Sequence, residues 1–237
     1  MTDAKPLTGR IALVTGASRG IGAATAQALA AAGAHVVLTA RTAQDLEAVE
    51  EVIHQGGGSA TIAPMDLTER DSIARLATAV AERWNRLDIL VINAAMLPPL
   101  TPVTQIEPKS FNKALTLNVL ATQALLAAFD PLLRRSEVGG QVIGVTSSVG
   151  AEPRAYWGAY GASKAAFDNL VSSYAQEVEK LSGTQVTLLD PGATRTQMRA
   201  RAYPGEDPDT IKPPQAVADR IVDILLNSDG IAARIRV

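Results

Sequence analysis

Two side chains stand at a spacing that suits proton transfer. Tyr160 and Lys164 lie four residues apart at the start of a helical pattern, so both project from one face of that helix. A tyrosine phenol has a reference pKa of about 10, which is too high for easy proton exchange at neutral pH. A lysine ammonium beside it favours the phenolate and lowers that pKa. Taken alone the pair is common, and it more often means a partly buried tyrosine beside an exposed lysine.

A serine strengthens the chemical interpretation of this pair. Ser147 stands thirteen residues before Tyr160, at the end of an expected strand. Its hydroxyl could hold a substrate oxygen there while Tyr160 delivers or removes the proton. Ser148 is adjacent and leaves an ambiguity, although the thirteen-residue interval favours Ser147.

A glycine-rich turn follows the first expected strand. Residues 15–22 read TGASRGIG, with the spacing G-x-x-x-G-x-G. Glycines at a strand-to-helix turn let the backbone approach a pyrophosphate, which then faces the helix N-terminus. Any tight connection could need a glycine, but the position of this turn in the first βα unit favours phosphate binding. We expect cofactor contacts from Gly16, Ser18, Arg19, Gly20, Ile21 and Gly22.

The end of the second expected strand indicates which dinucleotide binds. A site for NAD usually has a carboxylate about twenty residues further on, where it holds the ribose 2′-hydroxyl. This sequence has Ala40 and Arg41 there, and Arg19 lies inside the glycine turn. Arginine can bind a phosphate through two parallel hydrogen bonds. Two guanidinium groups without an acid predict NADP(H), against the alternative of two solvated surface arginines.

Alternating strands and helices must position these side chains. The short apolar runs are continuous, as expected of strands covered on both faces. Such alternation with right-handed crossovers predicts the α/β class, a Rossmann-type doubly wound parallel sheet of about seven strands with helices on both faces. The expected strands are Ile11–Thr15, Val36–Thr39, Ala60–Ala63, Ile89–Asn93, Gln141–Thr146, Gln185–Asp190 and Ala232–Val237. The expected helices are Ile21–Ala32, Ala43–Gln55, Arg70–Trp84, Lys109–Leu133, Tyr160–Leu181 and Pro214–Asn227.

No linker interrupts this rhythm, so we expect residues 1–237 to form a single dinucleotide-binding domain. The irregular stretch Gly192–Pro213 is rich in proline, arginine and acidic residues. It would lie beyond the carboxyl end of a late strand, where ligands bind in such folds. Because long structureless loops are seldom idle, we expect residues 192–213 to form a substrate lid, with a plain surface loop as the alternative.

The composition excludes several classes of protein. The 237 residues carry 22 basic and 24 acidic side chains, a net charge of −2, which argues against nucleic acid and against a polybasic membrane surface. The chain has no cysteine, which excludes a disulfide framework, a thiolate metal site and a cysteine nucleophile; we expect no metal.

The charge-free stretch Ile21–Ala40 is better explained by a helix and a strand than by a membrane span. Residues 1–6 lack the order of a secretory signal, and we expect a cytoplasmic protein.

Taken together and in this order, the motifs resemble those of the short-chain dehydrogenase/reductase family, in its short single-domain form with a Tyr-x-x-x-Lys motif. The match covers nearly the whole chain. It is highly specific as a set, although several of its motifs are weak singly. It comprises the glycine turn at residues 15–22, Asp66, Asn93-Ala94, Asn118, Ser147, Tyr160-x-x-x-Lys164 and Pro191-Gly192-x-x-x-Thr196.

The resemblance implies roles at the reacting centre. Tyr160 would be the general acid in reduction and the base in oxidation, and Ser147 would orient the carbonyl or alcohol. Lys164 would bind the nicotinamide ribose and lower the pKa of Tyr160. Asn118 would complete a water-linked proton relay to Lys164.

The resemblance also implies cofactor contacts. Asp66 and the backbone of Leu67 would contact the adenine, and Asn93 would lie along the cofactor. Thr196 would bind the nicotinamide carboxamide. Further contacts are expected from Ala94, Pro191, Gly192 and Thr194. Ala95 replaces a glycine that is usual in the family, which would shift the packing of the cofactor slightly.

The predicted function is NADP(H)-dependent oxidoreduction. Hydride would pass between the nicotinamide and a carbonyl or secondary alcohol, with Tyr160 as general acid or base. One alternative is specifically a 3-oxoacyl-thioester reductase. Another is a catalytically silent NADP-binding regulatory protein on the same fold, against which the complete set of Ser147, Tyr160, Lys164 and Asn118 argues.

The expected partners are a small carbonyl or alcohol substrate and further copies of the chain. A homodimer or homotetramer would form through the helices around Asn118 and after Tyr160, as in many relatives. Substrate identity is not encoded in a recognisable motif. Tyr156 and Trp157 are the expected lining of the substrate pocket. Arg199 and Arg201 could meet an acidic group of the substrate, although solvated surface charges are the favoured interpretation.

Overall fold

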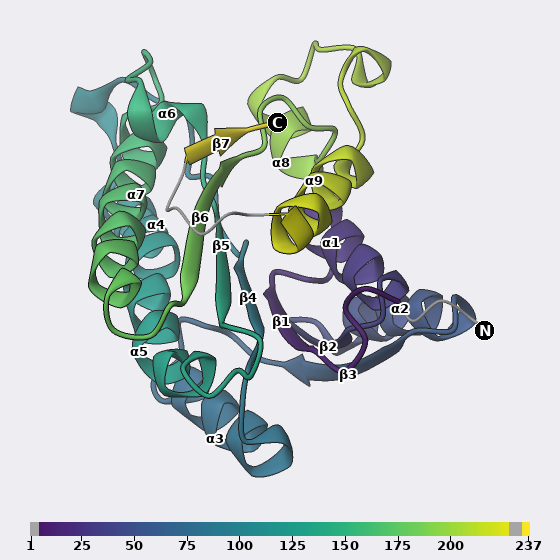
Figure 1. The fold of residues 1–237 in the computed structure, drawn as a ribbon. Coiled ribbons are helices and arrows are strands. Elements are labelled where there is room, and N and C mark those ends of the chain that lie inside the picture. The colour runs from purple at the N-terminus through teal and green to yellow at the C-terminus, as the bar shows by residue number, and fades with distance from the viewer. Residues whose placement is uncertain (1–4, 228–233) are drawn as a thin grey trace.

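The computed structural model describes residues 5–227 and 234–237, which form a seven-stranded sheet flanked by helices (Figure 1). The strand order is β3-β2-β1-β4-β5-β6-β7, and all neighbouring strands are parallel. This confirms the predicted doubly wound sheet. The strands are β1 (Ile11–Thr15), β2 (His35–Ala40), β3 (Ser59–Pro64), β4 (Ile89–Ile92), β5 (Gln141–Val145), β6 (Gln185–Asp190) and β7 (Arg234–Arg236). Residues 232 and 233 of the predicted last strand lie outside the described residues.

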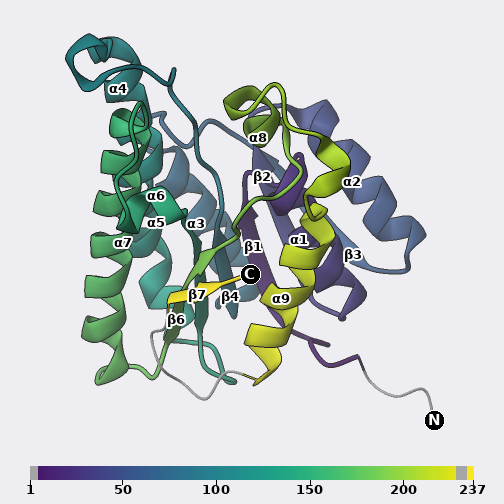
Figure 2. The ribbon, with the colours of Figure 1, turned by 90° about the horizontal axis from the view of Figure 1, so that it is seen from above.

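Helices cover both faces of the sheet, as Figure 2 shows from above. One face carries α1 (Gly20–Ala31), α2 (Ala43–Gln55) and α9 (Pro214–Asn227). The other carries α3 (Ser72–Trp84), α5 (Ala121–Leu133) and α7 (Gly158–Glu179). The remaining elements are η1 (Val103–Gln105), α4 (Pro108–Leu115), η2 (Thr116–Leu120), α6 (Ser148–Ala151), α8 (Gln197–Ala202) and η3 (Pro208–Thr210).

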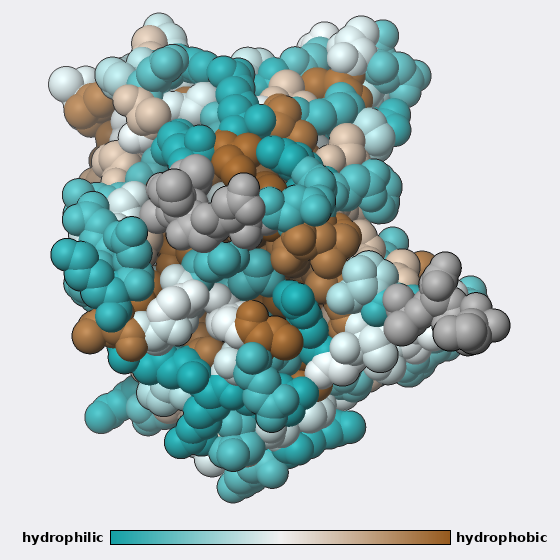
Figure 3. Space-filling view, in the orientation of Figure 1, coloured by the Kyte–Doolittle hydropathy of each residue, from teal (hydrophilic) through white to brown (hydrophobic). Residues whose placement is uncertain are grey.

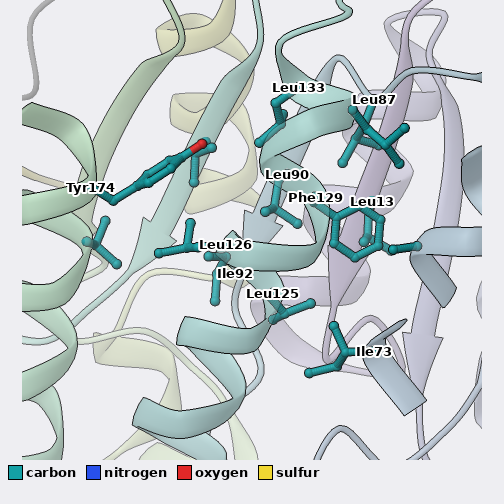
Figure 4. Close-up of a cluster of buried hydrophobic side chains, with 14 of the residues drawn as sticks. Leu13, Ile73, Leu87, Leu90, Ile92, Leu125, Leu126, Phe129, Leu133 and Tyr174 are labelled. Atoms are coloured by element: carbon teal, nitrogen blue, oxygen red, sulfur yellow. The ribbon is translucent and has the colours of Figure 1, made fainter. Parts of the chain in front are cut away.

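Each face of the sheet has its own hydrophobic core, because successive strand side chains point to opposite faces. On the α5 face, Leu13 and Leu90 pack with Leu125 and Phe129 (Figure 4). On the α1 face, Val14 belongs to the second cluster, together with side chains from α1, α2 and α9. Because all neighbouring strands are parallel, their carboxyl ends meet at one edge of the sheet.

The winding of the sheet reverses between β1 and β4. β1 pairs with β2 on one side and with β4 on the other. The helices after these two strands cover opposite faces, so the connections leaving β1 and β4 separate. Ligands bind at this kind of crevice in open α/β sheets. The glycine turn follows β1, and Asn93 follows β4.

Four predicted helices differ in detail from the observed ones. The predicted helix Ile21–Ala32 begins and ends one residue earlier, as α1 (Gly20–Ala31). The predicted helix Lys109–Leu133 consists of α4, a π-helical turn (η2) and α5. The predicted helix Tyr160–Leu181 begins two residues earlier, at Gly158, and ends at Glu179. The predicted helix Arg70–Trp84 begins only at Ser72, because Asp71 has a left-handed φ of 61°.

One continuous helical segment of the described chain, Pro108–Leu133, is long and apolar enough by length and composition to cross a membrane. Its apolar composition has a local cause, since Leu125, Phe129 and Leu133 lie in the core shown in Figure 4. On the outside, Figure 3 shows mainly hydrophilic residues over α7 and hydrophobic ones over part of α9.

Candidate active site

A cleft with a volume of about 1690 Å³ opens at the carboxyl edge of the sheet. That volume exceeds the range of about 300–1,000 Å³ usual for small-ligand pockets and leaves room for a dinucleotide beside a substrate. Of the predicted site residues, all but Gly22 and Asn118 line this one cleft, although they come from widely separated parts of the chain. The cleft-lining members are Gly16, Ser18, Arg19, Gly20, Ile21, Arg41, Asp66, Leu67, Asn93, Ala94, Ser147, Tyr160, Lys164, Pro191, Gly192, Thr194 and Thr196.

The glycine turn requires glycine at particular positions. Gly16 and Gly20 have φ values of +65° and +56°, in the left-handed region that glycine adopts at least cost. Gly22 lies under the turn, where a Cβ would stand only 2.2 Å from the Gly16 carbonyl oxygen. The Asn93 side chain holds the turn from β4, because its Nδ2 donates to the Thr15 carbonyl at 2.9 Å. The backbone is therefore free to approach a ligand closely at the N-terminus of α1.

A threonine at the end of β1 completes this support. The Thr15 hydroxyl accepts hydrogen bonds from the Asn93 and Ala94 amides at 2.9 and 3.0 Å. It donates to the Val91 carbonyl at 3.2 Å. These bonds lock the ends of β1 and β4 together at the crevice. The glycine motif includes Thr15, but its spacing alone did not identify this supporting role.

The far end of the cleft carries the residues expected to select the cofactor. Arg19 and Arg41 are exposed there, and neither forms an ion pair with another described residue. Asp66 accepts hydrogen bonds from the Thr68 amide and hydroxyl at 2.9 and 2.7 Å. Burial raises the pKa of Asp66, but the bonds from Thr68 and the charge of Arg41 lower it by more, so the net pKa is lowered. Asp45, on the first turn of α2, also lines this end of the cleft.

Tyr160 and Lys164 lie on the first turns of α7 and are both buried. The Lys164 Nζ donates to the Val145 carbonyl at 2.8 Å and stands 4.3 Å from the centre of the Phe167 ring. Burial lowers the pKa of Lys164 to about 8, against an opposing effect of Asp168. The pKa of Tyr160 is raised, mainly by burial and further by Asp190 and Asp168. This differs from the lowered tyrosine pKa expected from sequence, because desolvation exceeds any effect of the lysine charge in this geometry.

Ser147 is placed by the end of β5. It is the residue just before α6, and it lines the cleft. Ser148 is the first residue of α6 and is not among the cleft-lining residues. The position of Ser147 is the one that the thirteen-residue interval to Tyr160 indicated.

Asn118 lies beneath the cleft, in the π-helical turn η2, with 1 % of its surface exposed. Its Oδ1 accepts from the Met96 amide at 2.9 Å, and its Nδ2 donates to the Met96 carbonyl at 3.0 Å and to the Ser163 hydroxyl at 2.9 Å. Ser163 in turn donates to the Tyr160 carbonyl at 2.8 Å. The side chain of Asn118 thus fastens the loop after β4 to the helix of Tyr160. It makes no hydrogen bond to Lys164 in the described structure.

The segment expected to form a lid (residues 192–213, the lid segment) is folded rather than structureless. A bridge pairs Thr194 with Lys212 at its base, and α8 lies between them in sequence. The Thr196 hydroxyl caps α8 by accepting from the Arg199 amide at 3.1 Å. The Arg199 guanidinium is bound to Glu206 through Nε and Nη2, at 2.6 and 2.5 Å. Arg199 is therefore held in an ion pair inside the segment, and both it and the exposed Arg201 line the cleft.

An aromatic contact joins the lid segment to the start of α7. The Trp157 ring centre lies 6.0 Å from that of Tyr160 and 5.8 Å from that of Tyr203. Met198 Sδ is 3.9 Å from the Tyr160 hydroxyl. Trp157 lines the cleft as expected, but Tyr156 does not, since its side chain is 61 % exposed on a backbone with φ of 70°.

Within the described residues, no three His, Asp or Glu side chains are grouped so that they could hold a metal ion.

Comparison with known proteins agrees with the geometry of the cleft. Residues 10–207 match the family model for short chain dehydrogenase. The uncharacterized oxidoreductase YciK of Escherichia coli K12 is 37 % identical over 211 residues, which is 88 % of this chain and 82 % of that protein.

Two solved structures are also similar. A protein of Pseudomonas syringae, provisionally assigned as a short chain dehydrogenase, is 39 % identical with a TM-score of 0.93, over 100 % of this chain and 97 % of that one. A protein of Shigella flexneri with the same provisional assignment was solved in complex with NADP. It is 33 % identical with a TM-score of 0.92, over 99 % of this chain and 98 % of that one.

Proposed function

The chain belongs to the short-chain dehydrogenase family of oxidoreductases, and we propose that it uses NADP(H) to interconvert a carbonyl compound and a secondary alcohol. The observation that carries this proposal is the convergence of the glycine turn, Ser147, Tyr160 and Lys164 on one cleft. A catalytically silent protein would have no chemical need for this complete set.

The residues present fit a dinucleotide phosphate. The turn at Gly16–Gly22 has no room for a Cβ at Gly22, and it ends at the N-terminus of α1, where anions are favoured. Arg19 and Arg41 would hold the 2′-phosphate, and Asp66 with Leu67 would meet the adenine. NADP is bound by the similar Shigella flexneri protein. Asp45 is the residue that argues for NADH instead, because a carboxylate can accept hydrogen bonds from ribose hydroxyls.

The protein's part in the chemistry is proton transfer and orientation. NADPH would supply the hydride for the carbonyl carbon. Ser147 would donate a hydrogen bond to the carbonyl oxygen, and Tyr160 would deliver the proton to that oxygen as negative charge develops. Because burial raises its pKa, Tyr160 holds its proton at neutral pH, the form that can donate to the carbonyl oxygen. Lys164 would bind the ribose hydroxyls with the N–H groups that Val145 leaves free.

The lid segment would close over the reacting centre. Two contacts favour this closure: Met198 lies against the Tyr160 hydroxyl, and the Tyr203 ring lies against the Trp157 ring. These side chains would place an apolar or aromatic substituent next to the reacting carbonyl. Each chain would form one domain. The chains would assemble as a homodimer or homotetramer in the cytoplasm.

The first test is a fluorescence titration with NADPH and with NADH. NADPH should bind more tightly, and Arg41→Ala should weaken NADPH by about ten- to a hundredfold while leaving NADH unchanged, since a charge-assisted hydrogen bond contributes about 1.5–3 kcal/mol. Arg75→Ala, an exposed arginine on α3 that does not line the cleft, is the matched control. Equal affinity for both dinucleotides would overturn the choice of NADP(H).

The second test is consumption of NADPH with a panel of aldehydes, ketones and a 3-oxoacyl thioester. Turnover of an aryl or alkyl ketone supports the proposal. Turnover of the thioester alone identifies the narrower reductase. Tight binding of NADPH with no turnover of any carbonyl compound would favour the silent protein instead.

A further inference from the structure

A network of polar side chains joins the last strand of the sheet to the residues that surround Ser147. The Arg234 guanidinium, from β7, donates through Nη2 to the Ser147 carbonyl at 2.8 Å. Through Nη1 it forms an ion pair with Asp168 of α7. Asp168 also accepts a hydrogen bond from the Thr146 hydroxyl, at the end of β5. One arginine thus bridges the carboxyl end of β5 and the helix that carries Tyr160 and Lys164.

The surrounding packing leaves little freedom to this network. Gly150, in α6, donates its amide to the same Ser147 carbonyl at 3.0 Å. A Cβ on Gly150 would stand 2.7 Å from the Asp168 Oδ2 and 3.1 Å from the Lys164 backbone, so a larger residue there would displace the ion pair or α7. The Asp168 side chain is 13 % exposed and that of Arg234 is 32 % exposed. The pair therefore lies largely out of water, where its geometry is held better than at a free surface.

The position of β7 makes this contact possible. β7 is at the edge of the described sheet and pairs with β6, with Arg234 opposite Leu188. From that edge the Arg234 side chain reaches past β6 to β5 and α7. An arginine suits this place because its planar fork can donate to a carboxylate and a carbonyl at the same time. A lysine has one nitrogen and would keep the charge pair without fixing both acceptors.

We propose that Arg234 is a positioning residue for the reacting centre, which holds the Ser147 backbone and α7 in one fixed relation. Ser147 and Tyr160 must meet the same substrate oxygen, yet they come from different elements. Without Arg234, the Ser147 carbonyl keeps the bond from Gly150 among the described residues, and Asp168 loses the cation paired with it. Small displacements of reacting groups lower rates steeply, so the effect is expected in turnover more than in cofactor binding.

The charges agree with such a role. Two carboxylates change the pKa values at the reacting centre. Asp168, on α7, acts on Tyr160 and Lys164, and Asp190, on β6, acts on Tyr160. Asp168 raises the pKa of both, and Arg234 is the cation paired with it. Removal of Arg234 would strengthen the effect of Asp168. The pH dependence of turnover would then shift to higher pH in the variant, which a loss of stability alone does not produce.

The experiment compares Arg234→Ala and Arg234→Lys with the wild-type chain. Because the activity readout rests on the proposed function, a readout without activity is measured first, which is amide hydrogen exchange of residues 146–152. We expect faster exchange there in Arg234→Ala, with α3 unchanged, and an intermediate rate in Arg234→Lys. Arg220→Ala, which removes an exposed arginine paired with Asp223 on α9, is the control and should leave both segments unchanged.

With the carbonyl substrate found by the panel, Arg234→Ala should lower kcat by about ten- to a hundredfold, with the NADPH Kd unchanged. Arg234→Lys should restore part of that kcat. If Arg234→Ala fails to fold, Arg234→Lys is compared with the wild-type chain in its place. Unchanged exchange in 146–152 together with unchanged kcat in both variants would overturn the proposal. A fall in kcat explained wholly by a smaller folded fraction would also overturn it. If the wild-type chain reduces no carbonyl compound, the proposed function fails, while hydrogen exchange still decides the role of Arg234.

Discussion

The strongest stability prediction concerns Asn118, whose side chain fastens the loop after β4 to α7. Asn118→Ala removes three hydrogen bonds at once, to the Met96 amide, the Met96 carbonyl and the Ser163 hydroxyl. With a net contribution of about 1 kcal/mol for each bond, the free energy of unfolding should fall by about 3 kcal/mol. In a chain of this length, about 1 kcal/mol corresponds to about 2–4 °C, so Tm should fall by about 6–12 °C.

The assay is thermal unfolding followed by circular dichroism, without ligand, so that no substrate is needed. Asn112→Ala is the matched control, because Asn112 is exposed on α4 and its side chain makes no hydrogen bond to another described residue. Alanine also has a higher helix propensity, so the control should keep or slightly raise Tm.

The reasoning would be refuted if Asn118→Ala unfolded at the same temperature as Asn112→Ala. Such a result would mean that water replaces the amide at no cost, although the site is buried. It would also mean that the π-helical turn needs no side-chain support. A fall in Tm accompanied by normal far-ultraviolet spectra at low temperature would support the assigned role.

Three further predictions concern the cleft. Tyr160→Phe should lower kcat by about 10²–10⁴-fold while the NADPH Kd stays unchanged, measured by steady-state kinetics and titration; retained turnover would remove Tyr160 from its proposed role. Gly22→Ala should weaken NADPH binding by at least about tenfold, because the added Cβ would overlap the Gly16 carbonyl oxygen. Gly56→Ala is the control: the atoms nearest to its added Cβ are 3.5 Å away, so this variant should bind NADPH as tightly as the wild-type chain in the same titration. The free energy of unfolding should rise between about pH 8 and pH 10, because folded Lys164 has a pKa of about 8 and the unfolded lysine keeps its proton to higher pH. Urea unfolding at both pH values should find this rise in the wild-type chain and not in Lys164→Met.

The sheet and the contents of the cleft could be predicted because both depend on local signals. The apolar run Ile11–Thr15 followed by a glycine turn predicts a strand, a tight turn and a helix from neighbouring residues alone. The four-residue spacing of Tyr160 and Lys164 places both on one face of α7 by helix geometry.

The details that sequence did not predict depend on contacts between distant residues. The π-helical turn at Thr116–Leu120 contains Asn118, which bonds to Met96, 22 residues away, and no local propensity favours such a turn. The raised pKa of Tyr160 reflects burial by the folded chain, which the spacing to Lys164 does not contain. Arg234 and Asp168 are 66 residues apart in sequence, so their pairing exists only once β7 has joined the sheet.

The construction of the lid segment has a consequence for how substrate preference can change. Two of its arginines have their partners within the segment, since Arg199 binds Glu206 and Arg195 binds Asp209, and the pairing of Thr194 with Lys212 closes its base. Residues between those two anchors, other than the expected cofactor contact Thr196, can therefore be exchanged as a unit without disturbing the strands that carry the cofactor site. A chimaera that receives the corresponding segment of a relative would keep its dinucleotide preference and adopt a new range of carbonyl substrates.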